Sequence, residues 1–320
     1  DLFYALKANL RREQLIALRD AGISKIQPGI ESLSDTILRQ MRKGETALQN
    51  IQLLKWCREL GMHAAWNFLW GFPGEPPTEY DRMARLVPLL THLTPPVRYG
   101  PVRLDRFSPL FCDSHRLGLA RVAPLPAYRH VYPLPDTALG NLAYFFRYGY
   151  RESRDVAGYV EPLERALESW MKDGRHCDFF SVEVGDQLLL WDFRRGAREP
   201  LTILDGLNKA LYEAADAARP LDRIARVATG RSQGRALRKA EEGLERLTER
   251  GLIMRDGARW LALALPLGEH APRPGVVERF RETVRHLGKR VPGGVVIPLT
   301  AGTPAAPRRP PRGSRPRLRS

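Results

Sequence analysis

Long hydrophobic runs, closely spaced cysteines and an N-terminal targeting signal are all missing from this sequence of 320 residues. No stretch of eighteen apolar residues occurs, which excludes an ordinary membrane-spanning helix, so we expect no membrane partner. The three cysteines, Cys57, Cys112 and Cys177, stand 55 and 65 residues apart, so no pair has the spacing of a zinc site or metal-cluster loop. We therefore expect no metal ligand within this chain.

The chain opens without Met and without the basic and apolar regions of a signal peptide. Because its first residues already have the pattern of a strand, we expect a gene product that lost its upstream part, or a segment cut from one, with the cytoplasm as its compartment. The sequence does not distinguish a gene-calling truncation from a real loss.

The net charge of +15 is concentrated at the end of the chain. From Arg273 onward, twelve basic residues against two glutamates give +10 and leave +5 for the first 272 residues. The expected helix 236–250 mixes glutamates with arginines, which is typical of a solvated face and disfavours phosphate binding. We therefore expect no nucleic-acid partner; the oligomeric state is left open.

Residues 1–111 alternate between strand and helix patterns. Expected strands cover 2–6, 23–30, 62–70 and 98–107, and expected helices cover 11–20, 34–42, 47–60 and 79–92. This alternation predicts an α/β fold with a parallel sheet, either doubly wound or part of a barrel. In both folds, chemical groups gather at the carboxyl ends of the strands. The polar residues expected there are Lys7, Asn9, Gln27, Glu31, Ser32, Asn67, Glu75, Asp105, Arg106 and Ser108.

Three further regions follow. Residues 112–159 form an extension rich in Pro, Tyr and Phe, and residues 266–320 form a Pro/Arg-rich tail that we expect to be disordered apart from a short helix near 276–287. Between them, residues 160–265 contain a helix, a hairpin at 179–193, two or three helices and a second hairpin. This order predicts a smaller winged-helix-like α+β module. An exposed edge of the hairpin 179–193 would bind an extended peptide.

Two motifs suggest a nucleoside ligand, and each also has a purely structural reading. Glu31 and Ser32 end a strand with a carboxylate beside a hydroxyl, which suits the vicinal hydroxyls of a ribose, although Ser32 or Ser34 could simply cap the next helix. The glycines of segment 71–75 would let backbone approach a flat ligand such as adenine. Alone, that segment could be any turn between strand and helix.

Taken together, residues 27–32, 41–44, 49–50, 67–75 and 104–109 resemble the radical S-adenosylmethionine (SAM) core, most closely its cobalamin-dependent members that mature ribosomally made peptides. The resemblance implies a partial radical SAM β/α (TIM-like) barrel ending near residue 111. It implies SAM, a [4Fe-4S] cluster and cobalamin as cofactors, the last two held upstream because the CxxxCxxC loop is missing here. Under it, Gln27, Glu31, Ser32, Asn67, Leu69, Gly71, Glu75 and Arg106 bind SAM, while Lys7, Asn9 and Asp105 line the same opening.

The resemblance predicts an enzyme that modifies a precursor peptide by a radical reaction, with C-methylation favoured and no catalytic residue assigned. This chain alone is expected to be inactive and to hold no stable cluster. Two other hypotheses stay open: a catalytically inactive remnant that binds a peptide, and a winged-helix protein that binds nucleic acid.

Overall fold

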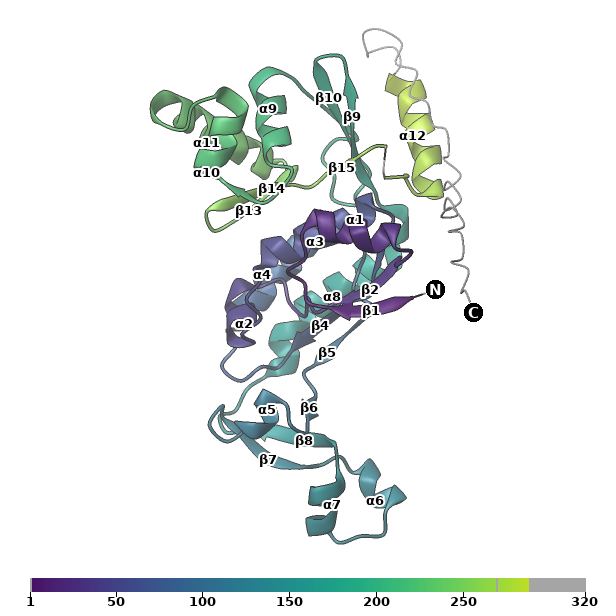
Figure 1. Cartoon of the computed structure of the whole chain (residues 1–320), viewed down its shortest axis with the longest axis vertical. Helices are drawn as coiled ribbons and strands as arrows, with labels where there is room; N and C mark the ends of the chain where they lie inside the picture. Colours follow the sequence, from purple (N-terminus) through teal and green to yellow (C-terminus); the bar gives the residue numbers. More distant parts are fainter. Residues whose placement is uncertain (1, 269, 288–320) are drawn as a thin grey trace, which may run out of the picture.

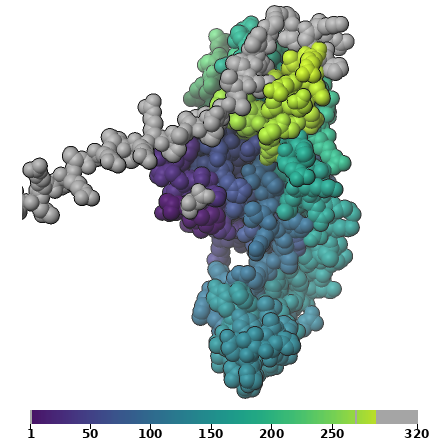
Figure 2. Space-filling model, turned by 90° about the vertical axis from the view of Figure 1, so that its right-hand side faces the viewer, coloured from purple at the N-terminus to yellow at the C-terminus, as the bar shows by residue number. Residues whose placement is uncertain are grey.

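The computed structural model describes residues 2–268 and 270–287. Along its longest axis the molecule has an extension at one end, a parallel sheet with its helices in the middle, and a second α+β module at the other end (Figure 1). We call these parts the extension, the sheet unit and the module. In a perpendicular view the extension forms a lobe of its own (Figure 2). None of the helices within the described residues combines the length and apolar character needed to cross a bilayer.

The sheet unit alternates strands and helices as expected, except that the expected strand 62–70 is divided into β3 and β4, which pair with different strands. Its strands pair in parallel in the order β1, β2, β3, and β4 pairs with β5; a bridge between Glu31 and Phe68 links the end of β2 to β4. The described strands form an open sheet and close no barrel. The elements are β1 (Phe3–Leu6), α1 (Arg12–Asp20), β2 (Lys25–Pro28), α2 (Asp35–Gln40), α3 (Ala47–Glu59), β3 (His63–Ala64), β4 (Asn67–Trp70), α4 (Thr78–Leu86), η1 (Val87–Leu90) and β5 (Arg98–Pro101).

Local sequence explains where helix α3 begins and ends. The hydroxyl of Thr46 accepts from the backbone N–H of Gln49 at 3.2 Å, and the side chain of Gln49 accepts from the backbone N–H of Thr46 at 2.8 Å. This reciprocal cap satisfies two donors that the first turn leaves free. Gly61, with φ of +67°, then stops the helix in a conformation that favours glycine.

The expected strand 98–107 is divided between two sheets. Its first part, β5, pairs with β4, and the last bond to that strand runs from the N–H of Val102 to the carbonyl of Trp70. The second part, β6, pairs antiparallel with β8 in the extension, where Leu104, Leu119, Ala143 and Phe146 form a small separate core. The extension comprises β6 (Leu104–Asp105), α5 (Pro109–Cys112), β7 (Leu119–Pro124), α6 (Ala127–Val131), α7 (Asp136–Leu142) and β8 (Phe145–Tyr150).

The module contains two small sheets and a helical group. Helix α8 packs on α4 of the sheet unit, helices α9, α10 and α11 pack on one another, and β12, β14 and β13 form an antiparallel sheet beside them. Its elements are α8 (Val156–Asp173), η2 (Gly174–His176), β9 (Phe179–Val184), β10 (Gln187–Asp192), β11 (Leu201–Leu204), α9 (Gly206–Ala214), β12 (Arg219–Pro220), α10 (Leu221–Thr229), α11 (Gly234–Glu249), β13 (Ile253–Asp256), β14 (Arg259–Ala262), β15 (Leu265–Pro266) and α12 (Pro274–Leu287).

The hairpin that we expected to offer a free edge has none. In the second sheet of the module the strand order is β11, β10, β9, β15, so both hairpin strands, β9 and β10, lie inside the sheet. Strand β15 comes from residues 265–266, and its pairing with β9 could not be read from the hairpin sequence. The open edge of this sheet, within the described residues, belongs to β11.

The short helix expected near residues 276–287 is present as α12, and Pro266, which we expected to be disordered, lies in strand β15. Strand β15 pairs with β9, and α12 buries Val276 and Phe280 against the module. Phe280 lies 4.7 Å from the ring of Trp191, edge to face. Of the remaining tail, residues 288–320 lie outside the described residues.

Charged and polar side chains on α3 join the sheet unit to the module. The ammonium of Lys55, 1% exposed, donates to the carboxylate of Asp216 at 2.6 Å, to the carbonyl of Asp216 at 3.2 Å and to the carbonyl of Ala262 at 2.9 Å. Gln52 accepts from the N–H of Ala218. The hydrophobic core runs continuously through both parts. The module is therefore held firmly on the helical side of the sheet unit.

Candidate functional site

The chain changes direction at Glu31, directly after β2. Glu31 has a φ of +60°, in the left-handed region that non-glycine residues seldom adopt. Its carbonyl accepts from the N–H of Leu69 at 2.9 Å, which fixes it beside β4. Such strain is found where the surrounding structure enforces it and often marks a functional position.

The carboxylate of Glu31 has one paired and one unpaired oxygen. Oε1 lies 3.6 Å from the ammonium of Lys43, which also donates to the carbonyl of Gly29 at 3.1 Å. Oε2 is buried and has no hydrogen-bond partner among the described residues. Burial raises the pKa of Glu31, and the charge of Lys43 only partly opposes this. A buried carboxylate oxygen without a donor is a suitable acceptor for a ligand hydroxyl.

Ser32 does not share this environment. Its side chain is fully buried, its hydroxyl lies 3.6 Å from the sulfur of Met83, and it accepts from the N–H of Ser34 at 3.2 Å. Asn50 fixes the segment further by donating to the carbonyls of Ile30 and Ser32. The hydroxyl of Ser32 therefore supports the loop and does not point to the same opening as Glu31.

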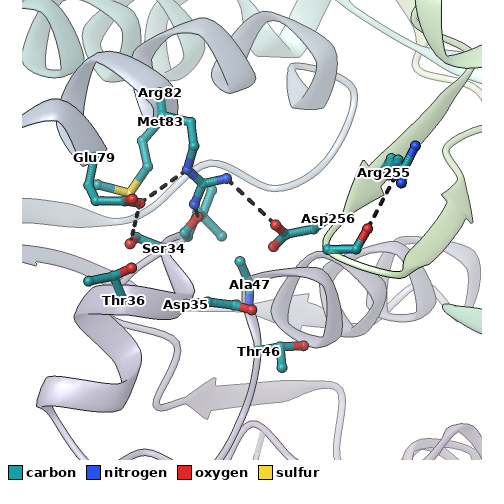
Figure 3. A network of polar contacts seen from close by, with 12 residues as sticks. Ser34, Asp35, Thr36, Thr46, Ala47, Glu79, Arg82, Met83, Arg255 and Asp256 are labelled. Carbon is teal, nitrogen blue, oxygen red and sulfur yellow. Dashed lines mark hydrogen bonds and ion pairs between the residues drawn. The ribbon is translucent and has the colours of Figure 1, made fainter.

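Ser34 is the residue that caps the next helix, as one reading of the sequence anticipated. Its hydroxyl accepts from the N–H of Ile37 and donates to Glu79 at 2.6 Å. Arg82 donates to Glu79 at 3.1 Å and lies 3.9 Å from Asp256 of the module (Figure 3). This network connects α2, α4 and β13, so the loop after β2 is anchored to both parts of the molecule.

The turn after β4 is built around Glu75, which is 1% exposed. Its carboxylate accepts from the N–H groups of Gly71 and Phe72, both at 2.8 Å, and from the hydroxyls of Tyr80 at 2.6 Å and Tyr159 at 2.5 Å. Burial, followed by the contact with Glu75, raises the pKa of both phenols. The Glu75 carboxylate accepts all four of these hydrogen bonds from groups of the protein itself. Glu75 therefore shapes the turn and does not point to a ligand.

Residues far along the chain complete the same turn. The hydroxyl of Tyr150 donates to the carbonyl of Gly71 at 2.6 Å, and Arg154 donates to the carbonyls of Phe72 and Glu75. A Cβ at Gly71, where φ is +82°, would come within 2.8 Å of the Tyr150 hydroxyl. Only glycine fits this position without strain.

The remaining expected site residues fall into two groups. Gln27, Asn67 and Leu69 are half-buried and lie on the face of the sheet opposite to Ile26 and Phe68, which are buried in the core. Asn67 is the first residue of β4 and so lies at its amino end, although the bridge at Phe68 places it near Glu31. Lys7 and Asn9 are exposed after β1.

Asp105 and Arg106 lie in the extension, apart from that face. The guanidinium of Arg103 binds both carboxylate oxygens of Asp105, and Arg106 donates to the carbonyls of Ala143 and Gly140. Both side chains stabilise the extension. Gln27, Asn67 and Leu69 thus share the half-buried face, Glu31 follows β2 with its backbone bridged to Phe68, Ser32 and Glu75 face inward, and Arg106 belongs to another sheet.

Sequence reasoning assigned no role to Lys43, Asn50, Tyr150 or Arg154, which orient the two loops. Signals existed for the first two: Lys43 precedes a glycine shortly after the carboxylate, and Asn50 interrupts the apolar face of a helix. For Tyr150 and Arg154 the only signal was an aromatic, Arg-containing run, which is typical of core.

The cysteines do not form a cluster site. Cys57 is buried in α3, where burial raises the pKa of its thiol to about 12, Cys112 is exposed at the end of α5, and Cys177 is buried before β9. Across residues 2–268 and 270–287, no three His, Cys, Asp or Glu side chains are placed to hold a metal ion. The described residues therefore do not fit an iron-sulfur cluster.

Comparison with known proteins supports a coarse classification. Residues 4–87, the stretch from β1 into η1, match the family model of the Radical SAM superfamily. A protein of Pyrococcus horikoshii described as an uncharacterized methyltransferase is 37% identical over 65 residues, which are 20% of this chain and 14% of that protein. The chain therefore spans about one seventh of that relative. No solved structure matches this chain.

Proposed function

We propose that this chain is part of a radical SAM enzyme, that it holds the nucleoside of SAM at the end of β2, and that the enzyme modifies a ribosomally made precursor peptide. One observation carries the proposal: within the family match, the strained Glu31 presents a buried carboxylate oxygen that has no partner in the described residues. A ribose hydroxyl is the kind of donor that such an oxygen needs.

In this proposal, each of the residues around Glu31 has a separate role in binding SAM. Lys43 holds the Oε1 side of the carboxylate, which leaves Oε2 for the ribose. The half-buried face with Leu69 and the turn held by Glu75 supply apolar surface and close backbone for the adenine. Asn50 keeps the loop in place from behind.

For the reaction, methyl transfer is the proposal that the comparisons support best, since the relative from Pyrococcus horikoshii is described as a methyltransferase. A SAM-bound iron-sulfur cluster supplies radical chemistry in this superfamily, and cobalamin would carry the methyl group. Because the described residues do not fit the cluster, the proposal gives this chain the tasks of holding SAM and positioning a peptide, with the metal chemistry supplied elsewhere in the enzyme.

The proposal is tested by equilibrium dialysis of the full chain with radiolabelled SAM. Glu31→Gln is expected to weaken SAM binding about tenfold, because a charged acceptor is replaced by a neutral amide. Glu13→Gln, at an exposed position on α1, is the matched control and should bind like the parent. Equal binding by both variants would remove the assigned role of Glu31.

The pH dependence of the same binding gives an independent check. The folded pKa of Glu31 is raised by burial, so the ionised acceptor forms at a higher pH than for an ordinary glutamate. SAM binding should therefore strengthen as the pH rises through that shifted pKa, and Glu31→Gln should abolish this dependence.

A further inference from the structure

Strand β11 is the open edge of the four-stranded sheet in the module. It pairs with β10 alone in the part of the chain that the structure describes. The opposite edge is the two-residue strand β15, which contains Pro266, continues into a bridge between Leu267 and His270, and lies near α3. A proline and a covering element are common means of blocking an edge.

The main-chain groups of β11 that point outward can be identified from its register. The N–H of Asp192 donates to the carbonyl of Pro200 at 3.0 Å, so these two residues form a hydrogen-bonded pair. Such pairs alternate with non-bonded ones in an antiparallel ladder. Thr202 and Leu204 therefore bond to β10, whereas the N–H and C=O groups of Leu201 and Ile203 face away from it.

No described group bonds to these outward N–H and C=O groups. The strand also lacks the usual protection, since it contains no proline, lysine or bulge. Ile203 is 41% exposed, although its cross-strand neighbour Leu189 is buried. An exposed β-branched residue beside four free main-chain groups offers both the ladder and the side-chain contact that a further strand would use.

Charge at the start of the strand favours one type of partner. The loop that enters β11 contains Arg194, Arg195 and Arg198. The first is buried against Asp192 and the second pairs with Asp173, but Arg198 is exposed without a partner within the described residues. A strand added at β11 would bring its end near this guanidinium, which favours an acidic residue there.

We propose that the outer edge of β11 binds an extended peptide by strand addition, with an apolar side chain packed on Ile203 and an acidic residue near Arg198. The inference rests on the proposed function in taking a peptide as the substrate class. Because Lys55 and its partners fix the module on α3, a peptide bound here would be tethered at a constant distance from the sheet unit.

The test uses the full chain and a phage-displayed library of random dodecapeptides as the probe. Ile203→Pro removes an outward N–H together with the β-branched side chain, and an edge strand tolerates proline at such a position. Ile203→Val keeps both the N–H and the β-branched shape and is the matched control. Peptides enriched on the parent protein should bind Ile203→Val equally and Ile203→Pro at least about tenfold more weakly.

Amide hydrogen exchange of the parent protein provides a readout that needs no variant. An enriched peptide should protect the amides of Leu201 and Ile203 and leave those of the buried strand β9 unchanged. Enriched peptides should also carry an acidic residue near one end and lose affinity for Arg198→Glu.

Three results would overturn the proposal: no enrichment, equal binding by Ile203→Pro, or a dimer that Ile203→Pro converts to monomer without any enriched peptide. Light scattering after gel filtration detects the dimer. SAM is not part of any of these measurements, so failure of the peptide site and failure of the SAM site are seen separately.

Discussion

At the joint on α3, the buried ammonium of Lys55 has three oxygen acceptors, whereas at the end of β2 the half-buried carboxylate of Glu31 keeps one buried oxygen without a donor. Both groups are ionisable, and both have polar partners: Lys55 contacts Asp216 and Ala262, and Glu31 contacts Lys43. They differ in whether the described chain satisfies them. At the joint, residues more than 150 positions away in the sequence provide the partners of Lys55. At the end of β2, no described residue provides a donor for Oε2 of Glu31.

We interpret this difference as one between structural charge and charge that is available to the proposed ligand. An unpaired buried polar atom costs free energy, which a ligand hydroxyl bound at Glu31 Oε2 would recover. A second structural example lies before β9, where Asp178 is fully buried and accepts from His270 at 3.0 Å and from the N–H of Arg273 at 3.2 Å. Perturbing each group should therefore have different consequences for stability.

The largest effect is expected for Asp178→Asn. Removing this charge leaves the guanidiniums of Arg58 and Arg273 close together in a largely buried position, so the free energy of unfolding should fall by about 3–5 kcal/mol. Urea unfolding at neutral pH measures the loss. Asp186→Asn, in the exposed hairpin turn, is the control and should change it by less than about 0.5 kcal/mol.

The difference in the free energy of unfolding between the parent and Asp178→Asn should depend on pH. Burial alone would raise the pKa of Asp178, but the hydrogen bond and charge of His270, together with Arg58 and the N–H of Arg273, outweigh it and lower the pKa. A lowered carboxyl pKa stabilises the fold above the unfolded value and loses this contribution as the pH falls through the folded value. The difference in the free energy of unfolding between the parent and Asp178→Asn should therefore reach its full size at pH 7 and become smaller below about pH 4.

A smaller loss is expected for Lys55→Met, which keeps the length of the side chain but leaves the carbonyl of Ala262 without its donor. Asp216 is about half exposed and can bind water instead, so the expected loss is about 2–3 kcal/mol. Lys172→Met, at an exposed position on α8, is the control. If Lys55→Met unfolded like the parent, the joint would be far weaker than its geometry indicates.

Features that depend on residues close together in the sequence could be predicted from the sequence alone. Strand and helix positions in the sheet unit, the cap at Ser34 and the hairpin turn at residues 185–186 follow from periodicity, capping residues and glycines. The strand split at Val102 depends on Phe145 and Phe146 in the extension, and the edge of β9 is covered by residues 265–266. Such contacts between distant segments leave no periodic signal in the sequence.

In the candidate site, too, features set by nearby residues were predictable, and features set by distant segments were not. The strand pattern predicted a carboxylate at the end of β2. The structure has Glu31 at this place, and one of its carboxylate oxygens has no hydrogen-bond partner among the described residues. That Ser32 would turn toward Met83, and that Glu75 would be enclosed by Tyr80 and Tyr159, depends on helices that pack from elsewhere. Residue type and spacing alone do not distinguish a group that contacts a ligand from one that supports the loop.

The smallest effect on stability, and the one with the opposite sign, is expected for Glu31→Gln. Because burial raises the pKa of Glu31, its ionised form is less favourable in the folded chain than in the unfolded one. A raised carboxyl pKa contributes stability below the unfolded value and loses it as the pH rises through the folded value. Glutamine stays neutral, so the variant should unfold at the same or a higher urea concentration at pH 7, and its advantage should vanish near pH 4. Saturating SAM should stabilise the parent more than the variant, since the charged carboxylate is a stronger acceptor for the ribose hydroxyl than the neutral amide. A variant clearly less stable than the parent without SAM would show that Glu31 is structural, like Asp178, and would remove the contrast between the two regions.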